Sequence, residues 1–157
     1  MKIKLLCVGK NNQSEWFDSV DDYLKRVNQY TSFTIDYVSE VKTGKKSIPD
    51  LIKKEEGKKL LSKIKKEDLV ILLDEKGKSF NSLAFAKKIE THQNNGVRNI
   101  VFIIGGAFGF SDQIYTSFPN RMRLSDLTFS HQMIRLFFCE QLYRAYSIIH
   151  KHPYHNS

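Results

Sequence analysis

The sequence predicts an α/β protein with a mostly parallel sheet flanked by helices. Strand-like and helical patterns alternate along the chain, and two apolar runs, at 68–74 and 99–106, have no polar face. Continuously apolar strands are typical of parallel sheets that helices cover on both sides. With 157 residues, of which 41% are hydrophobic, the chain can build one substantial core. We therefore expect a single domain over residues 1–157.

The first half of the chain is predicted to hold two strands and two helices. A strand is expected at 2–9, and a helix at 14–30 with Ser14 as its N-cap. Residues 33–40 alternate as a strand does. A loop rich in Lys, Gly and Pro then leads to a basic helix at about 50–65.

The second half is predicted to continue the alternation of strands and helices up to a long closing helix. The two buried strands are separated by a helix that stops near Gly96. In chain order we expect a strand at 68–74, a helix at 81–93, a strand at 99–106, a helix at 111–117, a strand at 121–125 and a helix at 130–150.

The helix predicted at 130–150 is apolar around well over a third of its circumference. A surface helix needs only one apolar stripe, so a second apolar face requires a cover besides the sheet. A homodimer interface is the simplest cover, and we expect one. Glu140 and Arg144 are spaced as an i,i+4 ion pair, worth about a few tenths of a kcal/mol.

The positive charge of the protein is concentrated in one segment. Residues 42–66 hold ten lysines against three acidic residues, so +7 of the net charge of +8 lies there. A cationic face suits a polyanion, because neutralising phosphates releases their counterions. The alternative is a solvated Lys/Glu helix that only confers solubility. The excess of lysine favours a nucleic-acid partner.

Targeting and membrane segments are not predicted. The apolar run at the N-terminus is too short for a secretory signal, and no stretch approaches the roughly 18 apolar residues of a membrane span. We expect a soluble, cytoplasmic protein with no membrane partner. Cys7 and Cys139 lie in apolar contexts and are expected to be buried thiols, not a disulfide.

Three loops are predicted to meet at the carboxyl edge of the parallel sheet, where ligands bind in such folds. The loops are LLDEKGKSF at 72–80, IIGGAFGFSD at 103–112 and LSDLTFSHQ at 124–132. They offer backbone donors and acceptors between apolar walls, a lining that suits adenine better than a pyrophosphate. The sequence has no P-loop lysine motif and no catalytic-metal spacing, so we expect no metal. The apolar walls are Leu73, Leu124, Leu127 and Phe129.

The glycines of IIGGAFG leave three interpretations open. The run reads GGxxG and not GxGxxG, yet Asp126 follows about 20 residues later, as a ribose-binding acid of a dinucleotide site would. A second interpretation is a tight turn without a ligand. In the third, Gly105 and Gly106 let backbone amides approach a bound nucleotide without interference from Cβ atoms.

Four motifs taken together resemble the RlmH (YbeA) family of SPOUT-class methyltransferases over essentially the full length. They are VILLDEKGK, FIIGGAFG, LSDLTFSHQMIRLFFCEQLYRAYSI and the terminal HPYH. The resemblance implies methylation of N3 of a pseudouridine in the helix 69 loop of 23S rRNA, on the assembled 70S ribosome, with S-adenosylmethionine as donor. It also implies a homodimer and a C-terminal trefoil knot over about 70–157, a feature that no periodicity argument finds.

The resemblance places the methyl-donor pocket on the three loops already described. One departure is Ser130, which stands where the family commonly has Pro before the motif histidine. Serine is a good N-cap, so the helix start should survive. The residues carried over to the donor pocket are Leu73, Gly105, Leu124, Ser125, Asp126, Leu127, Thr128 and Phe129.

The terminal HKHPYHNS is predicted to supply catalytic groups. An imide N3 carries a proton, so methylation needs a general base or an electrostatic partner for the resulting anion. His155 can accept a proton near neutral pH, and Tyr154 can stack on the target base or hydrogen-bond its carbonyl. Whether the tail completes its own pocket or that of a dimer partner stays open. So do a metal clip built from the tail histidines and a frayed end.

Arg135 and His131 complete the predicted catalytic set. They lie one turn apart on the closing helix and can together hold an RNA phosphate or the developing anion. The alternatives are that His131 caps or packs and that Arg135 bridges the dimer. The main rival function is a non-catalytic ribosome- or RNA-binding protein, which needs the basic helix but not the three-loop pocket.

Overall fold

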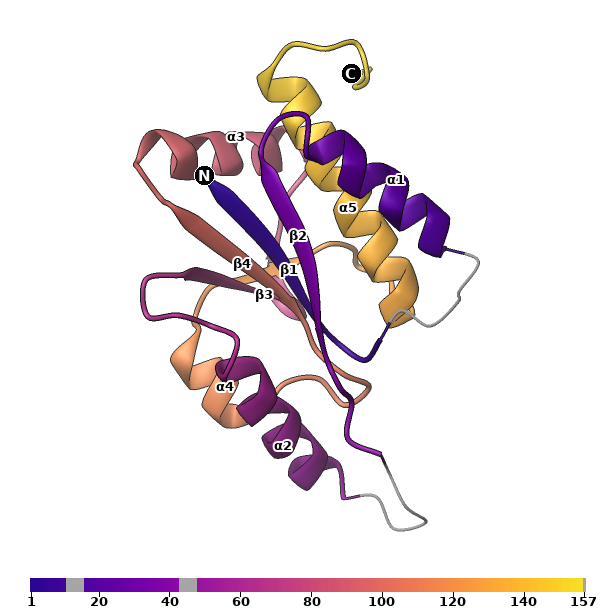
Figure 1. The fold of residues 1–157 in the computed structure, drawn as a ribbon, viewed down its shortest axis with the longest axis vertical. Coiled ribbons are helices and arrows are strands. Elements are labelled where there is room, and N and C mark those ends of the chain that lie inside the picture. Colours follow the sequence, from indigo (N-terminus) through magenta and orange to yellow (C-terminus); the bar gives the residue numbers. More distant parts are fainter. Residues whose placement is uncertain (11–15, 43–47, 157) are drawn as a thin grey trace.

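The computed structural model describes residues 1–10, 16–42 and 48–156, and shows a five-stranded sheet between two layers of helices (Figure 1). The named strands pair in parallel in the order β2-β1-β4-β3-β5, which confirms the predicted fold class. In chain order the elements are β1 (Lys2–Val8), α1 (Phe17–Val27), β2 (Ser32–Val38), α2 (Pro49–Leu61), β3 (Leu69–Ser79), α3 (Ser82–Asn94), β4 (Asn99–Ile104), α4 (Asp112–Ser117), β5 (Arg121–Arg123) and α5 (His131–Ile149).

Strand β3 differs most from its predicted length, because it continues to Ser79 beyond the apolar run. Its polar second half pairs with β5 after a register shift between Leu73 and Lys78. Gly77 permits this approach, since a Cβ at that position would lie 2.5 Å from the backbone nitrogen of Met122. Ser14, the predicted N-cap of α1, lies outside the described residues.

Both faces of the central strands are buried. Helices α1, α3 and α5 cover one face, and α2 and α4 cover the other (Figure 1). Neighbouring residues such as Leu5 and Leu6 on β1 therefore enter different cores and are both fully buried. This explains the continuously apolar strands. Among the described residues, every helix is too short or too polar to cross a membrane.

Helix α5 packs between α1 and α3 and keeps a second apolar face only partly covered. Phe138 and Leu142 are fully buried against the sheet, whereas Phe137 and Ile148 are half-buried. Cys7 and Cys139 are free and buried, as predicted, and burial raises the pKa of the Cys7 thiol to about 12. Part of the apolar surface of α5 therefore stays open to solvent in the single chain.

Ser130 caps α5, as predicted: its Oγ accepts a hydrogen bond from the Met133 backbone N–H at 3.4 Å. Ser130→Ala should lower the free energy of unfolding by about 1 kcal/mol, because a helix-terminal donor loses its partner. Urea denaturation measures this loss. Ser130→Asp is the control that keeps a cap, and an equal loss in both variants would contradict the capping role.

Candidate active site

A pocket of about 780 Å³ lies at the carboxyl ends of β4 and β5, beside the middle of β3 where its register shifts. This volume is within the range of small-molecule sites. The three predicted loops do meet here, and Lys53 of α2 adds to the rim. All eight residues predicted for the donor pocket line it: Leu73, Gly105, Leu124, Ser125, Asp126, Leu127, Thr128 and Phe129.

Protein packing requires the glycines of the central loop, residues 103–112. A Cβ on Gly105 would lie 3.2 Å from the Phe110 ring, and one on Gly106 would lie 2.4 Å from Oε2 of Glu56. The missing side chains therefore make room for protein atoms. Both glycines also line the pocket, so the approach of their backbone to a bound nucleotide stays a prediction. Gly109, at φ +78°, closes the turn by donating its N–H to the Gly106 carbonyl at 3.0 Å.

The loop between β5 and α5 is shaped by its own contacts. The Ser125 Oγ accepts a hydrogen bond from the Leu127 N–H at 3.0 Å, and Phe129 packs edge-on against Phe137 at 4.8 Å. Asp126 pairs with the Arg123 guanidinium at 3.0 Å. This ion pair disfavours the interpretation in which Asp126 is the ribose-binding acid of a dinucleotide site.

Two polar residues of the pocket had not been singled out from the sequence. The Tyr115 hydroxyl donates to Oδ2 of Asp74 at 2.6 Å, and Arg121 lies over the Tyr115 ring at 4.3 Å. Burial, followed by the bond to Asp74, raises the pKa of Tyr115, so it stays a neutral donor. Asp74 could have been predicted from the sequence, because it ends the apolar run of β3. Tyr115 could not, because its contact with Asp74 joins residues 41 positions apart.

His131 and Arg135 lie differently with respect to the pocket. His131 lies at the rim, where desolvation and then the Arg135 charge lower its pKa, so the imidazole is neutral at pH 7. Arg135 is 3% exposed, does not line the pocket, and its Nη2 donates to the carbonyls of Val8 and Gly9 at 2.8 and 2.9 Å. The guanidinium thus caps the end of β1, an arrangement that does not favour the predicted shared phosphate site.

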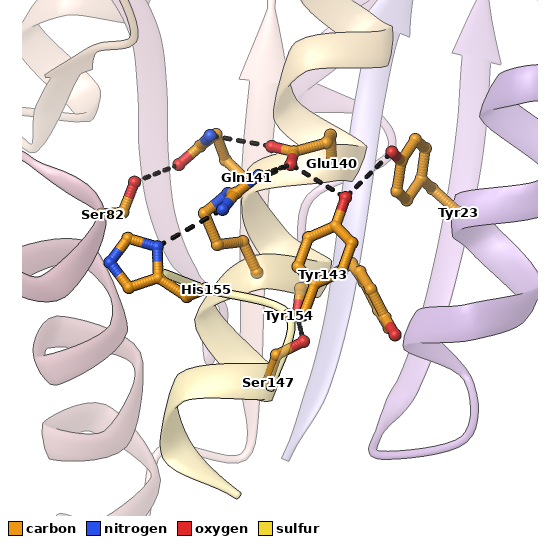
Figure 2. A network of polar contacts seen from close by, with 9 residues as sticks. Tyr23, Ser82, Glu140, Gln141, Tyr143, Ser147, Tyr154 and His155 are labelled. Atoms are coloured by element: carbon orange, nitrogen blue, oxygen red, sulfur yellow. Dashed lines mark hydrogen bonds and ion pairs between the residues drawn. The ribbon is translucent and has the colours of Figure 1, made fainter. Parts of the chain in front are cut away.

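The C-terminal tail is held against α1 and α5 by a polar network (Figure 2). The Tyr154 hydroxyl lies 3.1 Å from the Tyr23 hydroxyl and donates to Oε1 of Glu140 at 3.1 Å. Arg144 forms the predicted ion pair with Glu140, and its Nη1 lies 3.3 Å from Nδ1 of His155. Tyr154 and His155 are therefore brought together on one cluster, so the tail is not a frayed end.

The tail turns back along the second half of α5. The Tyr154 hydroxyl lies beside Glu140, and His155 lies beside Arg144. The pocket includes His131, the first residue of the helix, and Glu140 follows it by nine residues, which is about 14 Å along the axis at about 1.5 Å per residue. Neither Tyr154 nor His155 lines the pocket of its own chain, which disfavours the option that the tail completes its own site.

The other tail histidines are engaged with an aromatic side chain of α1's connection to β2. Nδ1 of His152 lies 2.6 Å from the Tyr30 hydroxyl, and His150 stacks on the Tyr30 ring at 4.9 Å. Within the described part of the chain, His, Cys, Asp and Glu side chains nowhere gather in threes as a metal requires. The tail histidines thus offer no metal clip in this arrangement.

Comparison with known proteins points to one family. The profile of a family described as "Predicted SPOUT methyltransferase" matches residues 1–155. "Ribosomal RNA large subunit methyltransferase H" of Flavobacterium psychrophilum is 43% identical over 156 residues, covering 99% of each chain. Proteins of the same name from Porphyromonas gingivalis and Bacteroides fragilis are 39% and 38% identical over the same span, again covering 99% of each chain.

Proposed function

Since this chain belongs to the SPOUT methyltransferase family, we propose that it methylates large-subunit ribosomal RNA with S-adenosylmethionine as donor. The observation that carries this proposal is the pocket formed by β3, β4, β5 and the loops that follow β4 and β5, lined by every residue expected to hold the donor. The proposed target is N3 of a pseudouridine in the helix 69 loop of 23S rRNA, on the 70S ribosome. This finer assignment rests on the resemblance of the four motifs, and it implies a cytoplasmic protein.

The residues of the pocket fit such a donor. Leu73, Leu127 and Phe129 supply apolar walls for an adenine, and the backbone of 124–128 supplies hydrogen-bonding groups beside them. When bound, S-adenosylmethionine supplies a methyl group on a positively charged sulfur. The protein's part is to hold the donor and the RNA base in contact, and positioning of this kind can account for much of a barrier reduction.

We infer that the active unit is a homodimer whose sites are composite. The pocket of one protomer would be completed by the tail of its partner, because a chain's own tail packs on the second half of its α5 and does not line its own pocket. The half-buried apolar face of α5 is the surface available for this association. In a two-fold dimer the same arrangement would occur twice.

The residues of the tail cluster can take separate roles in removing the N3 proton. Burial and the hydrogen bonds with Tyr23 and Glu140 raise the pKa of Tyr154, so its hydroxyl remains a donor. We therefore assign the proton acceptor to His155 and a hydrogen bond to a carbonyl of the base to Tyr154. Arg144, beside His155, would stabilise the anion that forms as the proton leaves.

The trefoil knot over about residues 70–157 is also proposed from the family resemblance. The strand order is compatible with it. The chain places β4 on one side of β3 and then returns to place β5 on the other, before α5 crosses to the opposite layer. The three loops that such a crossing would bring together are those that line the pocket.

Transfer of labelled methyl from S-adenosylmethionine to ribosomes that lack this modification tests the proposal. Mass spectrometry of rRNA fragments should place the label on N3 of one large-subunit pseudouridine. Folded protein that leaves intact, pseudouridylated ribosomes unlabelled would favour a non-catalytic RNA-binding protein.

A further inference from the structure

The carboxyl group of Glu56 is buried against the central loop of the pocket. Glu56 belongs to α2 and is 4% exposed. Its Oε1 accepts a hydrogen bond from the Val41 N–H at 3.2 Å. Its Oε2 has no hydrogen-bond partner among the described residues. The same oxygen lies 2.4 Å from the place that a Cβ of Gly106 would take. The carboxyl thus fills the space of the side chain that Gly106 lacks.

A second contact places α2 against the same loop. A Cβ on Gly57 would lie 2.9 Å from Oγ of Ser111 and 3.3 Å from Ile114. Ser111 follows the glycine loop and caps α4 by accepting a hydrogen bond from the Ile114 N–H. Glu56 and Gly57 therefore form one surface of α2, which contacts Gly106, Ser111 and Ile114.

We propose that Glu56 is a positioning residue for the methyl-donor pocket, holding the Gly105–Phe110 loop in the shape that binds the donor. This inference rests on the proposed function. Glu56 is not among the residues that line the pocket, so it acts through Gly106, which does line it. The bond to Val41 ties the same carboxyl to the segment after β2, and Lys59 strengthens that tie by donating to the Ser39 carbonyl at 2.9 Å.

The charge state of Glu56 follows from its surroundings. Burial raises its pKa, and Glu40 raises it further, while the Val41 N–H and Lys59 lower it. A raised carboxyl pKa favours the protonated form in the folded state. Its contribution to stability is present below the ordinary glutamate pKa and is lost as the pH rises through the folded value. Glu56→Gln mimics the protonated acid, so its melting temperature should exceed that of the wild type by a margin that widens as the pH rises through the raised pKa of Glu56.

The proposal is tested by calorimetric titration of the full-length protein with S-adenosylmethionine. Glu56→Ala should weaken donor binding about tenfold, because the loop loses its support, and Glu56→Gln should restore it. Gly106→Ala should weaken binding as well, since the new methyl group meets the carboxyl. The double variant should be no weaker than either single one, because removing the carboxyl vacates the space that the methyl needs. Glu55→Ala, one residue away and exposed towards Lys58, is the matched control and should bind as the wild type does.

The outcomes separate this inference from the proposed function. No binding of S-adenosylmethionine by the wild type would overturn both. Wild-type binding with an unchanged dissociation constant in Glu56→Ala, or losses that add in the double variant, would overturn the role of Glu56 alone. Ribosome binding, measured by sedimentation, should be unchanged in Glu56→Ala. A loss of ribosome binding equal to the loss of donor binding would indicate general unfolding and would contradict the positioning role. If Gly106→Ala does not fold, the difference in donor affinity between Glu56→Gln and Glu56→Ala still tests the role of Glu56.

Discussion

Replacing His155 by alanine should lower the rate of methyl transfer by about 100- to 10,000-fold, the range over which general bases act. The loss should appear in the single-turnover rate with pre-bound donor, because a general base acts in the chemical step and His155 does not line the donor pocket of its own chain. Binding of S-adenosylmethionine should therefore be unchanged. Tyr154→Phe, which keeps the ring but removes the hydroxyl, should give a smaller loss. A rate that does not change in His155→Ala would remove the tail from the mechanism.

Mixed dimers decide which pocket the tail completes. One protomer would carry His155→Ala, and the other would carry Ser125→Trp in the pocket wall, first checked for loss of donor binding. If the tail acts across the dimer, each mixed dimer holds one intact pocket facing one intact tail. Random association makes half of the dimers mixed, so activity should return to about a quarter of the wild-type value. No recovery would show that the tail serves its own chain.

Neutralising the lysines of α2 should weaken ribosome binding by about 10- to 100-fold at low salt and flatten its salt dependence. Lys53 lines the pocket rim, so the basic face of α2 adjoins the place where the RNA base must enter. Lys53 and Lys58 pair with Asp50 and Glu55 at 3.2 and 2.8 Å. Such exposed pairs are weak and can exchange for phosphates. The variant replaces Lys53, Lys54, Lys58 and Lys59 by glutamine.

A matched set of lysines away from the pocket provides the control for this variant. Lys87 and Lys88 lie on α3 and Lys25 lies on α1, in the helical layer on the other face of the sheet from α2. Lys2 is the first residue of β1, at the amino ends of the strands. Replacing these four by glutamine removes the same charge. Sedimentation across a salt series should show little change in slope. Equal effects of the two sets would mean that net charge alone drives binding.

The local elements could be predicted because their signals are local. Continuous apolar runs marked β3 and β4, helical spacing marked α5, and Ser130 marked its cap. The meeting of three loops followed as well, since the carboxyl ends of parallel strands share one edge. The second half of β3 was not predicted, because it is polar and pairs only with β5.

The sequence by itself determined the α/β class, the order of elements and the three loops of the pocket, and it predicts the chemistry of the tail. Tertiary structure decided how these parts face one another. A helix period puts His131 and Arg135 on neighbouring turns, yet only packing shows that the guanidinium caps β1. Tyr154 and His155 pack on the second half of α5 and not in the pocket of their own chain, and the approach of α2 puts Glu56 behind Gly106. These contacts join residues far apart in the chain, and their distances depend on how whole elements pack, which no local pattern records.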